Sequence, residues 1–218
     1  SVGRVFAVNT LGTVLGAVLT GLVLLPQMGL AMTFGLGIGL NLATGLLILA
    51  WARRPGWNVA TLAAPGFAVV FALVVSAQFS AGWDRSLGFG AWRMAVVPES
   101  WAAFEKLGRE IVPVYGKHGA GSTVSVVRQG ELAAGGFLSL RVNGKPDASS
   151  GSDMSTQMLL GHVPMLLHEK ASDVLVIGCG SGVTAGSVLQ HPSVGRLDLV
   201  EILPEVVHAA DEYFSPYN

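Results

Sequence analysis

Long apolar runs fill the first third of the chain, and short alternating runs follow in the remainder. Three of the long runs have the roughly 20 residues that a helix needs to cross a bilayer core. They cover about residues 5–25, 30–52 and 60–79. The pattern therefore predicts three transmembrane helices in a first domain of residues 1–82.

Glycines recur four positions apart within the first two of these runs. Gly12 and Gly16 form one such pair, and Gly35 and Gly39 form another. Small side chains let helix backbones approach closely in lipid, where no hydrophobic force drives helices together. We therefore expect these helices to pack on partners, including further transmembrane helices of a longer parent protein.

The distribution of charge divides the chain at the same place. Arg4, Arg53 and Arg54 are the charged residues of the first 83 positions, which contain no Asp or Glu. The expected solvent of this part is therefore the lipid bilayer. Two crossings separate Arg4 from Arg53-Arg54, so the positive-inside rule places both on the cytoplasmic face. We expect a multi-pass protein of a bacterial inner or cell membrane with a cytoplasmic soluble part, although a full third crossing would place that part outside.

The overall composition excludes several classes of site and partner. A net charge of -1 offers no clustered basic face for nucleic acid. Cys179 is the single cysteine, which excludes an internal disulfide and a multi-cysteine metal site, and we expect no metal. The sequence starts at Ser1 without an initiator methionine, and we expect it to be a fragment.

The remainder of the chain begins with a predicted linker or interfacial segment over residues 83–112. The apolar period then changes to two, which is typical of strands. Two such runs, Ser122–Arg128 and Phe137–Val142, predict a hairpin within a β region of residues 113–150. Asn143-Gly144 adds a tight-turn signal directly after the second run.

The last predicted domain, residues 151–218, opens with a helix over Ser152–Leu167. Pro164 is expected to kink or end this helix, because proline lacks the backbone N–H. The continuous apolar run Asp173–Ile177 follows, and such a run is typical of a strand buried on both faces of a parallel sheet.

A glycine-rich loop, Gly178-Cys-Gly-Ser-Gly182, joins this run to a predicted helix over Val183–Gln190 and a second strand over Leu197–Ile202. This order is that of a βαβ unit that binds a nucleotide or nucleoside. Glu201 ends the second strand, where an acid accepts hydrogen bonds from both ribose hydroxyls. We interpret Cys179 as a packing residue. The predicted nucleoside site comprises Gly178, Gly180, Ser181, Gly182 and Glu201.

Several segments together resemble the spermidine synthases, and most of all the branch in which membrane helices precede the synthase domain. The resemblance covers about residues 113–218. The segments that carry it are Asn143–Asp147, Ser152–Gln157, Gly161–Pro164, Val174–Gly182, Val188–His191 and Val200–Ile202.

The resemblance implies a fold class of N-terminal transmembrane α-helices followed by an α/β region. That region would contain a β-hairpin and the first half of a Rossmann-like, methyltransferase-type parallel sheet, truncated at Asn218. The implied enzyme of polyamine biosynthesis is a transferase that moves the aminopropyl group of decarboxylated S-adenosylmethionine to an amine such as putrescine. This nucleoside, or S-adenosylmethionine itself, would be a co-substrate, and no tightly bound cofactor is expected.

By the same resemblance, the glycine loop holds the nucleoside, while Asp147, Asp153 and Gln157 belong to the substrate site. Two departures from the family pattern concern charge. Ser181 stands where the family has an aspartate that helps to hold the cationic substrate, and Asp147 replaces a glutamine. The catalytic aspartate of the family is expected beyond Asn218, so we assign no catalytic residue and expect the fragment to be inactive.

Two other functions fit the same residues. An S-adenosylmethionine-dependent methyltransferase shares the βαβ unit and the ribose acid, and Ser181 favours it. A non-catalytic membrane transporter or sensor would use the soluble domain only to bind a nucleoside or polyamine. The expected partners are the lipid bilayer, a small-molecule amine and further helices of the parent; homo-oligomerisation is compatible with the sequence, and nucleic acid is not expected.

Overall fold

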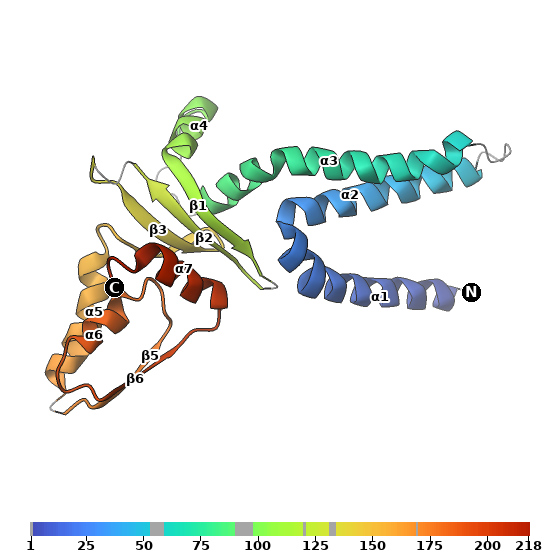
Figure 1. Cartoon of the computed structure of the whole chain (residues 1–218). Helices are drawn as coiled ribbons and strands as arrows, with labels where there is room; N and C mark the ends of the chain where they lie inside the picture. Colours follow the sequence, from blue (N-terminus) through green and yellow to red (C-terminus); the bar gives the residue numbers. More distant parts are fainter. Residues whose placement is uncertain (1, 53–58, 90–97, 120, 131–133, 169) are drawn as a thin grey trace. The chain divides into compact units, whose positions relative to one another are not determined.

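Figure 1 shows a computed structural model of the chain. It describes residues 2–52, 59–89, 98–119, 121–130, 134–168 and 170–218. The chain divides into two compact units. One comprises Ser1–Trp83 with His118–Gly121, and the other comprises Asp84–Lys117 with Ser122–Asn218. The four-part division and its boundaries at residues 82, 112 and 150 stay a prediction.

Helices make up most of the first unit. They are α1 (Val2–Leu19), the π-helical segment η1 (Thr20–Leu24), α2 (Leu25–Ala52) and α3 (Val59–Phe89), which extends into the second unit. Gly29 has the non-helical angles φ 73° and ψ 173° within α2. Figure 1 shows α1 and α2 running in opposite directions, and η1 connects them in the chain.

One helical stretch, Val2–Trp51, is long and apolar enough to cross a membrane, by length and composition. Ala63–Gln78 is a shorter apolar helix within α3. Within this stretch the non-helical Gly29 separates two helical parts, and the first two predicted spans lie on either side of it; the predicted end of the first span at Pro26 falls inside the helix that precedes this break. Three separate transmembrane spans stay a prediction.

Small residues bring α2 and α3 together. A methyl carbon added at Gly39 would lie 2.7 Å from the Cα of Val69, so the two backbones touch at this point. Ala43, Ala68 and Ala72 are buried. Gly35 also faces α3, whereas Gly12, Gly16 and Gly37 have open space around them. Of the two glycine pairs named in the sequence, the described structure therefore packs the pair on α2.

An antiparallel sheet forms one part of the second unit and follows the helix α4 (Trp101–Glu110). Its strands are β1 (Ile111–His118), β2 (Thr123–Gln129), β3 (Phe137–Val142) and β4 (Lys145–Ser149), in the order β1-β2-β3-β4. The predicted hairpin is confirmed, with Val124 opposite Val142 and Gln129 opposite Phe137. Asn143 and Gly144 have φ values of 51° and 76°, which form the predicted tight turn.

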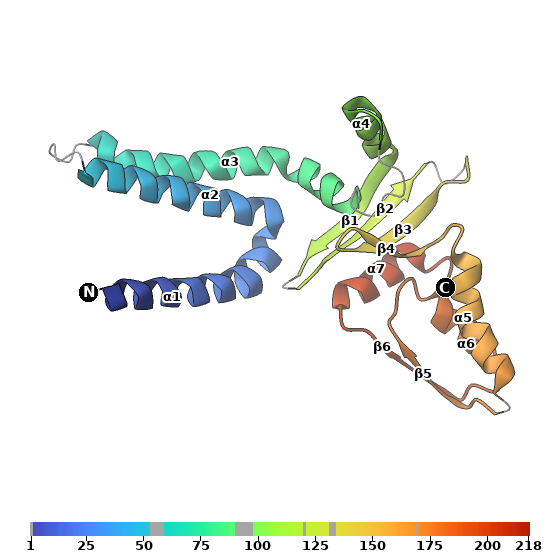
Figure 2. The same cartoon turned by 180° about the vertical axis from the view of Figure 1, so that it is seen from behind.

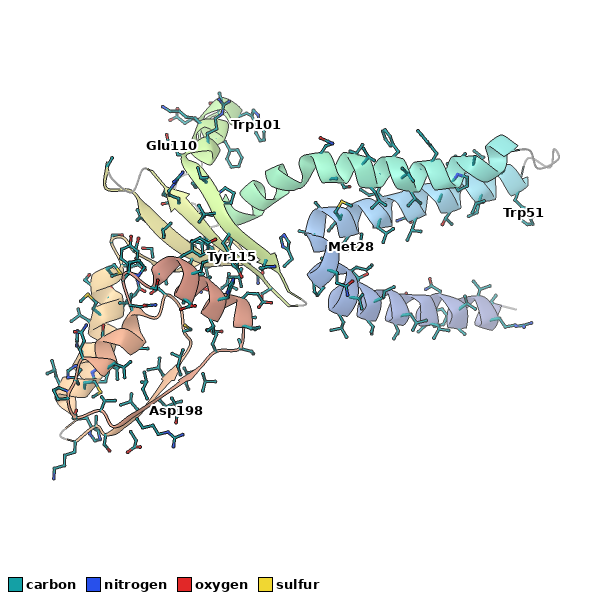
Figure 3. All side chains as sticks on the ribbon, viewed as in Figure 1. Met28, Trp51, Trp101, Glu110, Tyr115 and Asp198 are labelled. Carbon is teal, nitrogen blue, oxygen red and sulfur yellow. The ribbon has the colours of Figure 1, made fainter. Side chains whose placement is uncertain are left out.

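A helix that the sequence analysis did not predict, α7 (Pro204–Phe214), covers one face of this sheet. Phe214 is fully buried in the same cluster as Val126 and Leu140. Tyr115 of β1 (Figure 3) and Tyr213 of α7 are in contact, with ring centroids 5.7 Å apart and ring planes tilted by 51°. The hydroxyl of Tyr213 donates a hydrogen bond to the carbonyl of Val114 at 3.1 Å, so β1 and α7 are joined by polar as well as apolar contacts.

The rest of the second unit is α5 (Met154–Leu167) and the predicted βαβ unit. The βαβ unit consists of β5 (Asp173–Ile177), α6 (Val183–Leu189) and β6 (Arg196–Val200). β5 and β6 pair in parallel, as expected, and Figure 2 shows them from behind. Pro164 lies inside α5 and does not end it. The larger Rossmann-like sheet stays a prediction.

The expectation that Asp173–Ile177 is buried on both faces is wrong. The side chains of Leu175 and Ile177 are 59% and 81% exposed. Parallel strands are buried when further strands flank them and helices cover both faces. Among the described residues only β6 pairs with β5, so much of the apolar surface of these strands is left uncovered.

Candidate functional site

The loop between β5 and α6 turns sharply at its three glycines. Gly178, Gly180 and Gly182 have φ values of 93°, 54° and 85°, a region that side chains with a Cβ rarely adopt. The N–H of Gly178 donates to the carbonyl of Val200 at 2.8 Å, and the N–H of Gly182 donates to the carbonyl of Cys179 at 2.9 Å. The loop is therefore tied to the end of β6 and closed on itself.

Glu201 supports this loop from the end of β6. One carboxylate oxygen accepts a hydrogen bond from the N–H of Cys179 at 2.8 Å, and the other accepts from the N–H of Leu203 at 2.9 Å. Each carboxylate oxygen has two lone-pair sites, so both retain one for a ligand. A carboxylate held in this way can accept hydrogen bonds from two neighbouring hydroxyl groups.

Gln157 of α5 joins the loop to β4. Its amide nitrogen donates to the carbonyl of Ser149 at 2.7 Å and to the carboxylate of Asp153 at 3.1 Å. Its amide oxygen accepts from the hydroxyl of Ser181. Gln157 and Ser181 are both buried, and their mutual hydrogen bonding offsets the cost of removing these groups from water.

Asp153 is committed to the same network. Its second carboxylate oxygen accepts a hydrogen bond from the hydroxyl of Ser149, which in turn accepts from the N–H of Gly151 at 3.1 Å. Asp153 does not line the cavity that the other predicted residues share. The structure therefore places Asp153 behind Gln157, where it positions that side chain.

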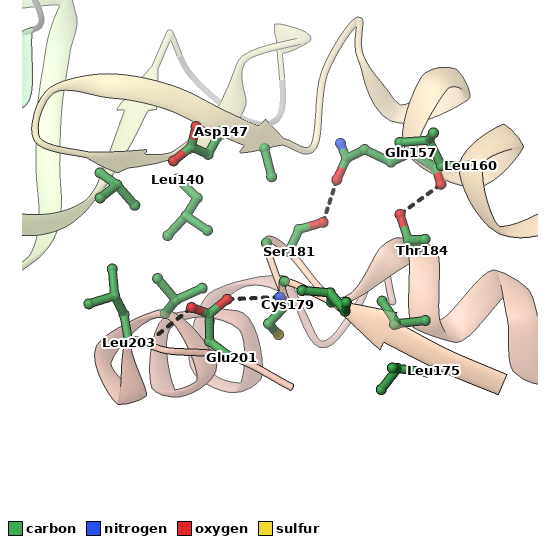
Figure 4. Close-up of a pocket in the computed structure, with 17 residues that line it drawn as sticks. Leu140, Asp147, Gln157, Leu160, Leu175, Cys179, Ser181, Thr184, Glu201 and Leu203 are labelled. Carbon is green, nitrogen blue, oxygen red and sulfur yellow. Dashed lines mark hydrogen bonds between the residues drawn. The ribbon is translucent and has the colours of Figure 1, made fainter. Parts of the chain in front are cut away.

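A cavity of about 600 Å³ lies between β3, β4, α5 and the glycine loop. Its size suits a nucleoside-sized ligand. Figure 4 shows Asp147 and Glu201 on opposite sides of the cavity, with Ser181 and Gln157 between α5 and the loop. Six of the eight predicted site residues line this cavity, namely Asp147, Gln157, Gly178, Gly180, Ser181 and Glu201.

Gly182 lies outside this cavity. It borders a second cavity of about 620 Å³, where a methyl carbon at its position would lie 2.5 Å from the side-chain nitrogen of Asn218. The side chain of Asn218 donates a hydrogen bond to the carbonyl of Ser181 at 2.9 Å. Gly182 thus serves the turn and the close packing of Asn218.

Asp147 lies on β4 and forms an ion pair with Lys145. Both side chains are partly exposed, by 29% and 48% respectively. Asp147 is the one wall residue whose carboxylate is matched by a lysine within the part of the chain that the structure describes. The two acids of the cavity therefore differ: Glu201 is held by backbone N–H groups, and Asp147 by a partly exposed lysine side chain.

Cys179 has little nucleophilic character. Burial raises the pKa of its thiol, and the nearby carboxylate of Glu201 raises it further. The thiol therefore stays protonated where an ordinary cysteine begins to ionise. This agrees with the interpretation of Cys179 as a packing residue.

Sequence reasoning missed several residues of the wall. Thr184, in the first turn of α6, donates a hydrogen bond to the backbone carbonyl of Gln157 at 2.9 Å. Leu140 and Leu203 supply apolar surface from β3 and from the segment after Glu201. Thr184 lies two residues after the glycine loop, so the motif could have identified it, whereas Leu140 lies far from the motif in the sequence and lines the cavity from the antiparallel sheet. Among the described residues, no group of three or more His, Cys, Asp or Glu could hold a metal ion.

Part of the chain that forms this cavity is similar to known proteins. Residues 153–218 match the model of the spermine/spermidine synthase domain. The chain is 37% identical over 73 residues to a polyamine aminopropyltransferase of Leptospira biflexa, a match that covers 34% of this chain and 26% of that protein. It is 46% identical over 55 residues to the polyamine aminopropyltransferase of Thermotoga maritima, covering 25% of this chain and 19% of that protein.

A solved structure is similar over a longer part of the chain. The crystal structure of spermidine synthase from Thermotoga maritima matches with a TM-score of 0.44 and 27% sequence identity, over 49% of this chain and 36% of that one. The chain spans about a quarter of the length of the first curated relatives that it matches.

Proposed function

Because the C-terminal part of this chain belongs to a spermidine synthase-like family, we propose that it forms the nucleoside-binding part of an aminopropyltransferase. The observation that carries the proposal is the paired backbone support of Glu201 at the wall of a 600 Å³ cavity. In this proposal the supported carboxylate of Glu201 accepts hydrogen bonds from a vicinal pair of hydroxyls, such as those of a ribose.

The proposed co-substrate is decarboxylated S-adenosylmethionine, and the proposed acceptor is a small amine such as putrescine. The amine nitrogen would attack the aminopropyl carbon next to the sulfonium sulfur, and the carbon–sulfur bond would break. Both electrons of that bond stay on sulfur, which leaves as neutral methylthioadenosine. The attacking amine must first lose its ammonium proton to a base.

Neither carboxylate of the described cavity wall is placed to be that base. Glu201 is held by two N–H groups and Asp147 is paired with Lys145, while Asp153, behind the wall, accepts from Ser149 and Gln157. We therefore expect the 218-residue chain to bind the nucleoside without transferring its aminopropyl group. Assaying methylthioadenosine release from decarboxylated S-adenosylmethionine and putrescine checks this. Turnover on the order of 1 s⁻¹ or faster would contradict it.

We further propose that the helical first unit anchors this site to a bacterial inner membrane, with three spans and a cytoplasmic soluble part. The long apolar stretch Val2–Trp51 and the shorter one at Ala63–Gln78 support the anchor. Partition of the expressed chain between membrane and soluble fractions tests the anchor, and a monodisperse protein in buffer without detergent would contradict it.

Calorimetric titration of methylthioadenosine into the chain tests the nucleoside site. Glu201→Gln should weaken binding by about 10- to 100-fold, because a charged hydrogen-bond acceptor is replaced by an amide that can accept on one side only. Glu110→Gln, an exposed position on α4, is the matched control and should leave the affinity unchanged. Equal affinities of Glu201→Gln and the original chain would remove Glu201 from the site.

One observation favours a second function, nucleoside binding without catalysis: the side chain that is hydrogen-bonded to Gln157 is an uncharged serine. Ser181 is buried and hydrogen-bonded to Gln157, so this position supplies no carboxylate for a cationic substrate. A domain that binds a nucleoside without catalysis needs no such carboxylate. Methylthioadenosine binding without turnover in the full-length parent protein would support this sensor or transporter function over transfer.

A further inference from the structure

Two carboxylates of the cavity could pair with a cationic ligand, and they differ in the groups that hold them. Asp147 and Glu201 are the ionisable carboxylates of its wall, and they lie on opposite sides (Figure 4). Glu201 is oriented by two backbone N–H groups, which cannot move away without breaking the loop. The Asp147 carboxylate is instead paired with the Lys145 side chain, which can rotate away from it without breaking any backbone hydrogen bond.

The tight turn between β3 and β4 determines this pairing. Asn143 and Gly144 close the turn with Val142 opposite Lys145, so Lys145 is the first residue of β4. Asp147 follows two positions later, at the irregularity where the β3–β4 register shifts between Leu140 and Arg141, and its carboxylate pairs with Lys145 there. The turn thus holds a cation beside the carboxylate that lines the cavity.

We propose that Lys145 is a specificity-determining residue that reduces the preference of this site for cationic nucleosides over neutral ones. The inference rests on the proposed nucleoside site. Lys145 neutralises Asp147 before any ligand arrives, so a sulfonium or ammonium group must displace it to reach the carboxylate. A neutral thioether nucleoside such as methylthioadenosine has no positive charge to pair with that carboxylate. Its affinity therefore does not depend on Lys145.

The size of the effect follows from the exposure of the pair. The two side chains are 48% and 29% exposed, so water and salt screen their attraction. Exposed ion pairs of this kind change binding or stability by a factor of about two to five. Lys145 therefore tunes the choice between ligands and does not prevent either from binding.

The test titrates two ligands into the 218-residue chain in detergent micelles. The ligands are decarboxylated S-adenosylmethionine, which carries a sulfonium and an ammonium group, and methylthioadenosine, which is neutral. Lys145→Gln should bind the cationic ligand about two- to fivefold more tightly and methylthioadenosine equally well. Lys170→Gln removes the same charge at an exposed position away from the cavity wall and should change neither affinity.

Asp147 supplies the second arm of the test. Lys145→Gln introduced into an Asp147→Asn background should no longer tighten cation binding, because the carboxylate that Lys145 shields is gone. The gain from Lys145→Gln in the original chain should also shrink between about 0.05 M and about 0.5 M salt.

A failure of the role of Lys145 and a failure of the proposed nucleoside site give different results. Unchanged cation affinity in Lys145→Gln, or an equal gain for both nucleosides, overturns the role of Lys145 while the nucleoside site stands. A gain that persists in the Asp147→Asn background also overturns it. Failure of both nucleosides to bind the original chain overturns the proposed site and this inference together.

Discussion

At Gly161 the absence of a side chain lets α5 and α6 pack in contact. A methyl carbon added there would lie 2.7 Å from the Cβ of Ser187 and 2.7 Å from the carbonyl oxygen of Thr184. The second of these is backbone and cannot rotate away. Because α5 carries Gln157 and α6 follows the glycine loop, this contact also holds the two sides of the network around Ser181 together.

We expect Gly161→Ala to destabilise the chain by about 1–3 kcal/mol, the usual cost of overpacking a tight contact. Gly108→Ala is the matched control, because Gly108 lies inside the exposed helix α4 with open space around it. That change should be stabilising by about 0.5–1 kcal/mol, since alanine is the better helix former. Urea unfolding of both variants measures the difference, and equal midpoints would contradict the predicted contact.

At the scale of elements, α2 and α3 depend on small residues in the same way. The backbone of α3 at Val69 touches Gly39, whereas Gly37 on the same helix faces open space. The fourfold spacing of Gly35 and Gly39 in the sequence made Gly39 a candidate for close packing. Only the structure distinguishes the glycine that packs from the glycine that does not.

Gly39→Val should therefore weaken the packing of α2 on α3 by about 1–3 kcal/mol, because the added side chain would collide with backbone atoms. Gly37→Val introduces the same side chain into the same helix and should leave this packing intact. Thermal melts of helical circular dichroism in one detergent compare the two variants. A lower melting temperature for Gly37→Val than for Gly39→Val would show that the described α2–α3 contact is not the stable one.

At the scale of the whole molecule, three buried or partly buried acids make the fold sensitive to alkali. Burial raises the pKa of Tyr115, Tyr213 and the Cys179 thiol, and the carboxylates of Glu205, Glu212 and Glu201 add to these shifts. The neutral forms are favoured in the folded state. Their contribution to stability is fully present below the ordinary pKa values of 9.0 for cysteine and 10.0 for tyrosine, and is lost as the pH rises through the raised values.

We therefore expect the free energy of unfolding to fall as the pH is raised from about 8 to about 11, by at most about 1.4 kcal/mol per pH unit for each group. Urea unfolding at several pH values measures this slope. Tyr213→Phe removes one of the three groups and should make the slope shallower, at the cost of the hydrogen bond to Val114. A stability that is constant or rises over this range would contradict the prediction.

The sequence by itself determined the local elements and the chemistry of the loop. The hairpin over β2 and β3, the turn at Asn143-Gly144 and the order of the βαβ unit were predictable, because each depends on neighbouring residues and a short period of apolar positions. The glycines at 178, 180 and 182 were predictable for the same reason, since a positive φ is a local requirement.

Tertiary structure alone decided how the predicted site residues are used. Gln157 is joined to Ser181 of the glycine loop, 24 residues away, and Asp153, predicted to hold substrate, accepts hydrogen bonds from Ser149 and Gln157 behind it. It also decided that β5 is exposed and that the unpredicted helix α7 covers the antiparallel sheet. Burial and long-range hydrogen bonds depend on residues far apart in the chain. A local pattern of apolar and polar positions does not specify which distant segments pack against one another.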